Sequence, residues 1–251
     1  MVKYGIDVSY HQGEIDWNKV KNSGKADFVI LRAGIGLKKD VRFEEYYANC
    51  KKLGIPVGAY WYSYATTGAK AIQEATCFLD AVKGKQFEYP LFFDIEESNQ
   101  FSTGIANCSY VARTFCEALE KAGYYVGIYA SKSHLEDYLT AEVRERFAVW
   151  VAHYGVGQTS YSGQFGMWQK SDTGRIDGIS GDVDLDECYI DYPEIIQGRG
   201  FNGFEKAEAI TPIVVEVEPE DVPEMKRKRA IEIVIKLDGE IVKSDTVEID
   251  C

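Results

Sequence analysis

The 251-residue chain lacks the features that mark several classes of protein. No apolar run reaches the eighteen or so residues of a membrane-spanning helix, and the N-terminus has no apolar stretch of signal-peptide length. The formal net charge of -12 also argues against nucleic acid, because neutralising a phosphate backbone needs a basic face. We therefore expect no stable membrane insertion, no nucleic-acid partner, and synthesis in the cytoplasm without a signal peptide.

Residues that bind metals are few and scattered. The three histidines, His11, His134 and His153, lie far apart, and the six cysteines show no paired metal-ligand spacing. Cys108 and Cys116 fall on the apolar side of one predicted helix, which favours buried thiols over disulfides. The sequence gives no indication of a zinc site.

Aromatic residues, in contrast, are abundant. They make up 13% of the chain, with 17 tyrosines and 4 tryptophans, which is more aromatic surface than core packing requires. Clefts rich in tyrosine suit sugars and peptides. The length fits a single α/β barrel with a small appendage.

The first half of the chain alternates short β-rich runs with amphipathic helical segments, which is typical of parallel βαβ units. We expect strands at about 3–8, 27–33, 56–62, 89–95 and 124–129, and helices near 17–23, 42–53, 68–82, 105–122, 132–139 and 141–146. Three further strand-like runs follow at 147–154, 164–171 and 182–189, with too little sequence between the last two for a long helix. The pattern predicts an irregular TIM-like barrel of the α/β class, organised as (β/α)5β3, over residues 1–196.

Barrel enzymes place their chemistry at the carboxyl ends of the strands. Ordinary loops would place Gly, Asn and Lys at these positions, but here nearly every predicted strand ends in another polar or aromatic residue. The strand ends are Asp7, Arg32, Tyr60, Tyr62, Tyr64, Asp94, Glu96, Tyr129, His153, Gln169 and the aspartates around 184.

The segment LFFDIEES carries the densest charge among these strand ends. Side chains alternate along a strand, so Asp94 and Glu96 should face one cleft with Cα atoms roughly 6.5 Å apart, while Glu97 turns away or starts the loop. Two carboxylates in one cleft tend to divide into a protonated and an ionised group, as glycosidic cleavage requires. The alternative is a solvated acidic strand end, which the further carboxylates at other strand ends disfavour.

Several motifs in order resemble the family 25 glycoside hydrolases over residues 3 to 192. They are YGIDVSYHQGEIDW, FVILRAGIG, GAYWYSYA, LFFDIEES and GDVDLDE. The resemblance implies a muramidase that hydrolyses the β-1,4 bond between N-acetylmuramic acid and N-acetylglucosamine in bacterial cell-wall peptidoglycan, without metal or organic cofactor. It also implies an endolysin that acts at the cell wall after release through a separately encoded membrane pore.

The same resemblance assigns roles to four carboxylates. Glu96 matches the general acid, and Asp94 matches the residue that stabilises positive charge on the sugar or orients its N-acetyl group. Asp7 matches the family's first-strand aspartate, and Asp184 its last-strand aspartate. Asp186 stands where the family often has Asn, so Asp182, Asp184 and Asp186 all remain candidates for the cleft, with Asp184 preferred. A covalent route and assistance by the N-acetyl group both remain open.

Candidate sugar-binding residues follow from the same strand ends. Tyr60, Tyr62 and Tyr64 share one parity and either turn their rings toward the cleft or pack in the core and at the rim. The same two interpretations apply to Arg32, Tyr129 and Gln169.

Beyond the barrel the composition changes. Residues 197–211 are expected to form a linker, and residues 212–251 a small β-rich segment with a hairpin at Asp238-Gly239 and a short strand between Pro212 and Pro219. So few residues bury little core alone, so this segment should pack on the barrel, bind the cell wall, or pair with another chain as a homo-oligomer.

Two other functions fit parts of the pattern. Chitinase-like barrels also end a strand with Asp-x-Glu, but after a longer acidic run than LFF. A sugar-binding barrel without catalysis is the second alternative. Retention of Asp7, Asp94, Glu96 and Asp184 together argues against a pure binder, which needs no carboxylate at the acid position.

Overall fold

The computed structural model describes residues 1–206, 228–237 and 240–250. By contact the chain divides into two compact units, Met1–Ala207 and Glu208–Cys251. Among the residues that the structure describes, every helix is too short or too polar to reach across a bilayer.

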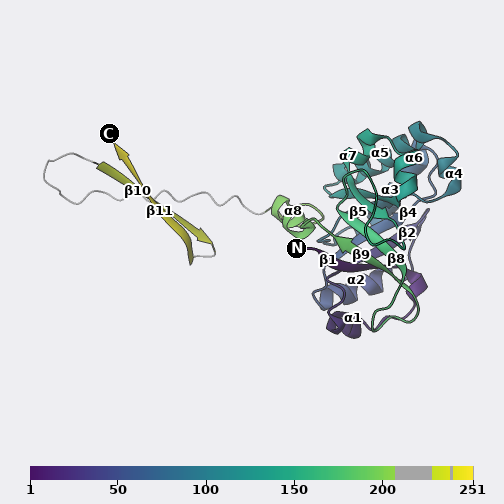
Figure 1. Ribbon diagram of the computed structural model, residues 1–251, viewed down its shortest axis with the longest axis horizontal. Coiled ribbons are helices and arrows are strands. Elements are labelled where there is room, and N and C mark those ends of the chain that lie inside the picture. Colours follow the sequence, from purple (N-terminus) through teal and green to yellow (C-terminus); the bar gives the residue numbers. More distant parts are fainter. Residues whose placement is uncertain (207–227, 238–239, 251) are drawn as a thin grey trace. The chain divides into compact units, whose positions relative to one another are not determined.

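The first unit is a closed barrel of eight strands (Figure 1). Parallel pairing joins β1 (Lys3–Val8), β2 (Phe28–Ile35), β4 (Val57–Tyr62), β5 (Leu91–Asp94), β6 (Val126–Ser131), β7 (Ala148–Ala152) and β8 (Met167–Gly174). The last strand, β9 (Val183–Cys188), runs antiparallel between β8 and β1 and closes the barrel. A two-residue strand, β3 (Lys38–Lys39), extends the sheet beside β2.

Helices follow the first five barrel strands. They are α1 (Trp17–Ser23), α2 (Phe43–Lys52), α3 (Gly68–Val82), α5 (Ile105–Lys121), α6 (Lys132–Tyr138) and α7 (Ala141–Arg146). Between β7 and β9 the described chain forms no helix, so the predicted (β/α)5β3 organisation is confirmed. Three short helical elements were not expected: the 3-10 helix η1 (Tyr10–Gln12), α4 (Ser98–Phe101) and α8 (Tyr192–Arg199).

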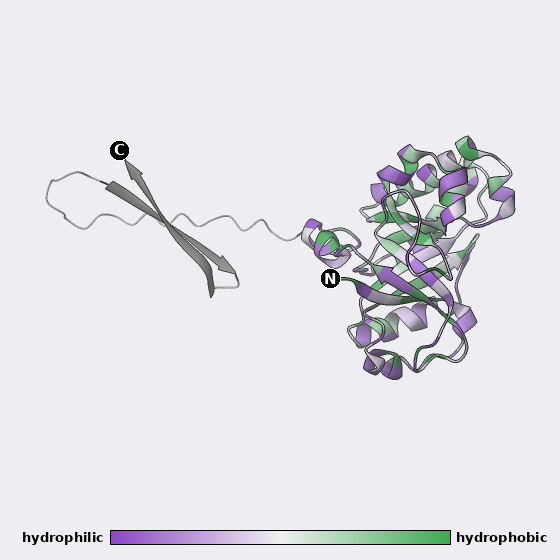
Figure 2. Cartoon of the chain, viewed as in Figure 1, coloured by the Kyte–Doolittle hydropathy of each residue, from purple (hydrophilic) through white to green (hydrophobic). Residues whose placement is uncertain are grey.

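The helices pack on the barrel through one apolar face each, while hydrophilic residues occupy their other faces (Figure 2). In α5 the buried face includes Val111, Phe115 and Leu119, together with Cys108 and Cys116. The five cysteines in the described part of the chain are all free thiols, as expected. A second core fills the barrel interior, where Phe92, Trp150 and Met167 are among the buried residues.

The amino-terminal end of the barrel is closed by α8 and the residues that follow it. Tyr192 and Ile196 join the interior core, and Phe201 and Phe204 pack against it. Asn202 is fully buried with a φ of 54°. Its side-chain amide donates to the carbonyls of two residues, Phe87 and Tyr89, and its oxygen accepts from the Tyr125 backbone N–H. The boundary expected after residue 196 thus falls inside α8, and the first residues of the expected linker pack on the barrel.

The second unit contains two antiparallel strands, β10 (Lys228–Leu237) and β11 (Glu240–Asp250). Leu237 pairs with Glu240, which agrees with a hairpin centred on the Asp-Gly dipeptide. The dipeptide itself and the short strand expected between Pro212 and Pro219 lie outside the described residues.

Candidate active site

A pocket of about 280 Å³ lies at the barrel end where the parallel strands finish. Carboxylates, tyrosines and one arginine dominate its wall. The lining residues are Asp7, Ser9, His11, Gln12, Arg32, Tyr60, Tyr62, Asp94, Glu96, Tyr129, Trp150, Tyr154, Gln169 and Asp184. The structure therefore brings together every site residue expected from the sequence except Tyr64.

Tyr64 lies outside this pocket, two residues beyond the end of β4 at Tyr62. Its side chain is exposed, and its ring packs edge-on against Tyr62 with centroids 5.5 Å apart. Tyr62 is fixed from the other direction, because its hydroxyl donates to Glu97 at 2.8 Å. Tyr64 can therefore support Tyr62 but does not line the pocket itself.

Asp94 and Glu96 both face the pocket, as alternation predicts. Asp94 is the last residue of β5 and is buried, while Glu96 lies two residues beyond it. Glu97 begins the next element as the N-cap residue of α4. It does not line the pocket, but it is only partly exposed and accepts the Tyr62 hydroxyl, so it is more than a solvated surface charge.

Burial makes the charged forms of both pocket carboxylates costly. It raises the pKa of Glu96 to about 7, with further increases from the charges of Asp184 and Glu97, while the nearby Tyr129 hydroxyl opposes the shift. Burial, followed by the charge of Glu96, also raises the pKa of Asp94 well above its usual range, and the nearby Arg32 works against this. A pair of this kind can hold a proton at neutral pH.

A second carboxylate cluster forms where β1 and β9 pair, since Asp7 lies directly opposite Asp184. Because β9 is antiparallel, Asp184 stands at the start of its strand and still reaches the barrel end where the other strands finish. Asp186 lies deeper, is buried, and accepts from Trp150 Nε1 at 2.9 Å. Asp182 is exposed and pairs with Arg175 at 2.5 Å. Of the three candidate aspartates, only Asp184 lines the pocket.

The three carboxyl groups of this cluster interact through their charges, since, besides burial, the charges of Asp184 and Asp186 both raise the pKa of Asp7. Burial raises the pKa of Asp7 and of Asp186 well above the usual range. Burial, with the charge of Asp172, raises the pKa of Asp184 to about 6.

Gln169 links this cluster to the tyrosines. Its Nε2 donates to Asp7 Oδ2 at 2.6 Å, and its Oε1 accepts from the Tyr129 and Tyr154 hydroxyls at 2.6 and 2.5 Å. A buried amide of this kind fixes which Asp7 oxygen accepts and how both phenols point. Gln169 and Tyr129 were expected from the sequence, whereas Tyr154 was not.

The missed residues carried weak sequence signals. Trp150 and Tyr154 are an even number of residues apart, and both side chains face the pocket. His153, which was expected at the end of that strand, turns away and contacts Thr159 through Nδ1 at 3.1 Å. Asp40 holds the buried Arg32 by an ion pair of 2.8 Å, and it lies in a loop that no strand-end argument reaches. In the described part of the chain, no group of three or more His, Cys, Asp or Glu residues is arranged to hold a metal ion.

Comparison with known proteins gives consistent results. The family model described as glycosyl hydrolases family 25 matches residues 6–179. The autolytic lysozyme of Clostridium acetobutylicum is 31% identical over 184 residues, which is 73% of this chain and 55% of that protein. The chain thus matches only about half the length of this relative.

Two solved structures with a similar fold are matched over more of their own length than this relative is. The bacterial lysozyme of Streptomyces coelicolor is 30% identical with a TM-score of 0.64, over 75% of this chain and 92% of that chain. The catalytic domain of endolysin ply40 from bacteriophage P40 of Listeria monocytogenes is 27% identical with a TM-score of 0.65, over 79% and 98%. The family match spans most of the barrel, including Asp7, Asp94 and Glu96, so the chain belongs to the glycosyl hydrolases of family 25.

Proposed function

We propose that this protein is a peptidoglycan hydrolase that cleaves the β-1,4 bond between N-acetylmuramic acid and N-acetylglucosamine. The observation that carries the proposal is Glu96, a pocket carboxyl group whose pKa is raised to about 7, beside the buried Asp94. Family membership and relatives named lysozyme support the same reaction.

In the proposed reaction Glu96 is the general acid. Its proton passes to the glycosidic oxygen as the bond to the sugar carbon breaks, and the leaving sugar departs as an alcohol. Asp94 stabilises the positive charge that develops on the remaining sugar, directly or by orienting its N-acetyl group. A water molecule then adds to that carbon and returns a proton to Glu96.

The other pocket residues hold the substrate and tune the charge. Tyr60, Tyr62 and Tyr129 offer rings and hydroxyls to the sugars, and Arg32 and Gln169 offer hydrogen-bond donors. The charge of Asp184 keeps the pocket electronegative, which favours a transition state with positive charge on the sugar and helps Glu96 retain its proton.

The test is a digest of purified Gram-positive peptidoglycan, followed by borohydride reduction and mass spectrometry, with Glu96→Gln as the control. Newly reduced muramic acid ends from the wild type alone would establish the muramidase and its acid. Reduced glucosamine ends would identify a glucosaminidase instead. No fragments from several wall types, or cleavage of chitin alone, would favour the sugar-binding barrel or the chitinase-like enzyme.

We further propose that the protein acts as an endolysin, made in the cytoplasm and active at the cell wall after release. The resemblance to a bacteriophage endolysin domain supports this proposal. Expression in a bacterium with and without a co-expressed membrane pore tests it. Lysis that needs the pore is expected, and lysis without any pore would contradict the release step.

Residues 212–251 have three candidate roles, namely homo-oligomer formation, wall binding and passive packing. Within the described residues β10 and β11 pair only with each other, and a two-stranded sheet that can accept a further strand favours self-association. Light scattering of the full chain and of residues 1–206 distinguishes the roles. An oligomer that disappears on truncation supports self-association, and a monomeric full chain contradicts it.

A further inference from the structure

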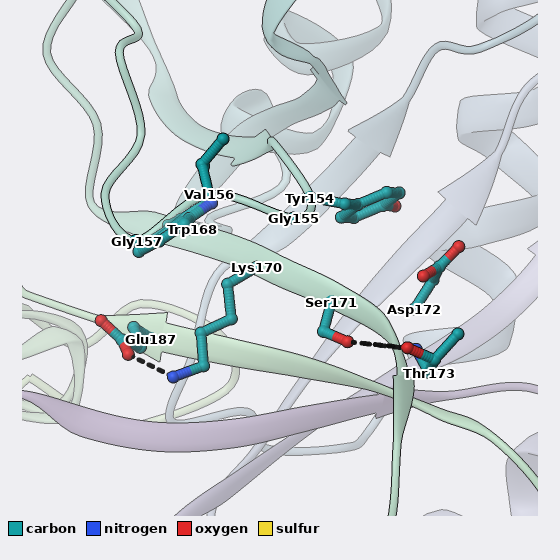
Figure 3. Close-up of a pocket in the computed structure, with 10 residues that line it drawn as sticks. All are labelled: Tyr154, Gly155, Val156, Gly157, Trp168, Lys170, Ser171, Asp172, Thr173 and Glu187. Atoms are coloured by element: carbon teal, nitrogen blue, oxygen red, sulfur yellow. Dashed lines mark hydrogen bonds and ion pairs between the residues drawn. The ribbon is translucent and has the colours of Figure 1, made fainter.

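A second groove, of about 680 Å³, adjoins the catalytic pocket (Figure 3). Tyr154 lines both cavities. Strand β8 also contributes to both, because Gln169 faces the catalytic pocket while its neighbours Trp168 and Lys170 face the groove. The groove and the catalytic pocket therefore share Tyr154 as a common wall.

The groove carries charges of both signs. Lys170 Nζ pairs with Glu187 Oε1 at 2.6 Å, and the lysine side chain remains 35% exposed. Its ammonium has three donors, so this pair leaves it able to bind a further anion. Asp172 is exposed and lines the groove, and its charge contributes to the raised pKa of Asp184 in the catalytic pocket. Figure 3 shows Asp172 and Tyr154 on one side of the view and Lys170 with Glu187 on the other.

Backbone and hydroxyl groups complete the lining. Gly155 and Gly157 have no side chains to obstruct an approaching main chain, and both are exposed. The hydroxyls of Ser171 and Thr173 lie 3.3 Å apart and face the same cavity. Such groups suit hydrogen bonding to peptide amides and carbonyls.

These features fit a charged peptide better than a sugar chain. The glycan strand of the proposed substrate is rich in neutral hydroxyl groups, whereas the short peptide on each muramic acid carries carboxylates and an amino group. A cation and an anion at separate points of one groove complement such a zwitterion. We propose that this groove binds the peptide stem of the muramic acid next to the scissile bond, with a peptide carboxylate at Lys170 and its ammonium at Asp172.

This inference rests on the proposed function for its substrate, but its binding step can be measured alone. The probe is the N-acetylated peptide acetyl-L-Ala–γ-D-Glu–L-Lys–D-Ala, whose only ammonium is that of the lysine, titrated into the ¹⁵N-labelled full chain and followed by amide chemical shifts. We expect saturable shifts at Gly155, Gly157 and Ser171, and affinity about fivefold weaker in Lys170→Met, in keeping with a partly exposed ion pair.

Two further variants separate binding from folding. Lys132→Met removes a lysine that also pairs with a glutamate, Glu136, at comparable exposure, but lines neither cavity, so it should bind like the wild type. Lys170→Arg keeps the cation and should retain binding. Absence of shifts in the groove, or equal affinity in wild type and Lys170→Met, would overturn the inference. The inference would also be overturned if a peptide-free glycan changed the chemical shifts of the groove amides and the peptide did not.

Turnover on two substrates then links the groove to catalysis. On peptidoglycan, Lys170→Met should raise KM by about fivefold relative to the wild type. On glycan strands stripped of peptide by an amidase, the KM of Lys170→Met should equal that of the wild type. An equal rise in the KM of Lys170→Met on both substrates would overturn the inference. If the wild type cleaves neither substrate, the proposed function fails, and the peptide titration still decides this inference.

Discussion

Replacement of Glu96 by glutamine tests two properties of this side chain, its role as a proton donor and its effect on the free energy of unfolding. The two side chains have nearly the same shape, so the pocket should stay intact. The amide cannot supply the proton to the glycosidic oxygen, and we expect turnover to fall by about 10²- to 10⁴-fold.

The same change should stabilise the protein at high pH. Burial raises the pKa of Glu96 from its ordinary value of 4.5 to about 7. At 1.36 kcal/mol for each tenfold change in proton affinity, the ionised side chain costs the folded state about 3 kcal/mol. Asp184 can take up a proton in its place, so this figure is an upper bound.

The sign follows from the raised pKa. Below pH 4.5 the wild-type group is protonated in both folded and unfolded states, and the variant should have nearly the same stability. As pH rises through about 7 the folded wild type loses stability while the glutamine variant does not.

Urea unfolding of both proteins at pH 4, 6 and 8, with turnover of peptidoglycan in parallel, tests both expectations. A free-energy difference that does not grow with pH would refute the assignment of a raised pKa to Glu96. Turnover within tenfold of the wild type would refute its role as the acid. Glu97→Gln is the matched control, because its amide oxygen can still accept the Tyr62 hydroxyl, and its turnover should stay within about threefold.

Three further outcomes are expected. Wild-type turnover should decline as pH rises through about 7, because Glu96 must be protonated to act, and a rate that holds to pH 9 would exclude it as the acid. Asp186→Asn should stabilise the fold more at pH 8 than at pH 5, since it removes a buried carboxyl group yet keeps an acceptor for Trp150; equal urea midpoints in variant and wild type at pH 8 would contradict this. Asn202→Ala removes three buried hydrogen bonds and should cost about 3 kcal/mol of unfolding free energy; a loss below about 1 kcal/mol would show that the segment after α8 contributes little.

The barrel was predictable because its signals are local. Apolar runs and helical periodicity located α1, α3 and α7 at their observed ends. Side-chain alternation along one strand also predicted that Asp94 and Glu96 share a face, and the family motifs identified Asp7. All three line the pocket. Each of these inferences depends only on neighbours in sequence.

The features that were missed depend on contacts between distant segments. Asp40 forms an ion pair with Arg32, and Asn202 forms hydrogen bonds to three backbone groups in distant segments. No local pattern therefore marks either residue. The antiparallel direction of β9 is set by barrel closure, and it places Asp184, the residue preferred from the motif, at the start of its strand and in the pocket. Helix α8 has too little contrast between its faces for periodicity to reveal it.

The position of β9 also sets when the site can exist. This strand is the last of the barrel to leave the ribosome, yet it must insert between the first strand and β8, and it delivers Asp184 opposite Asp7. Until it arrives the sheet keeps two open edges and the pocket lacks one wall. The proposed hydrolase therefore completes its catalytic pocket only after β9 has been made, so chains inside the producing cell that stop before β9 carry no complete site.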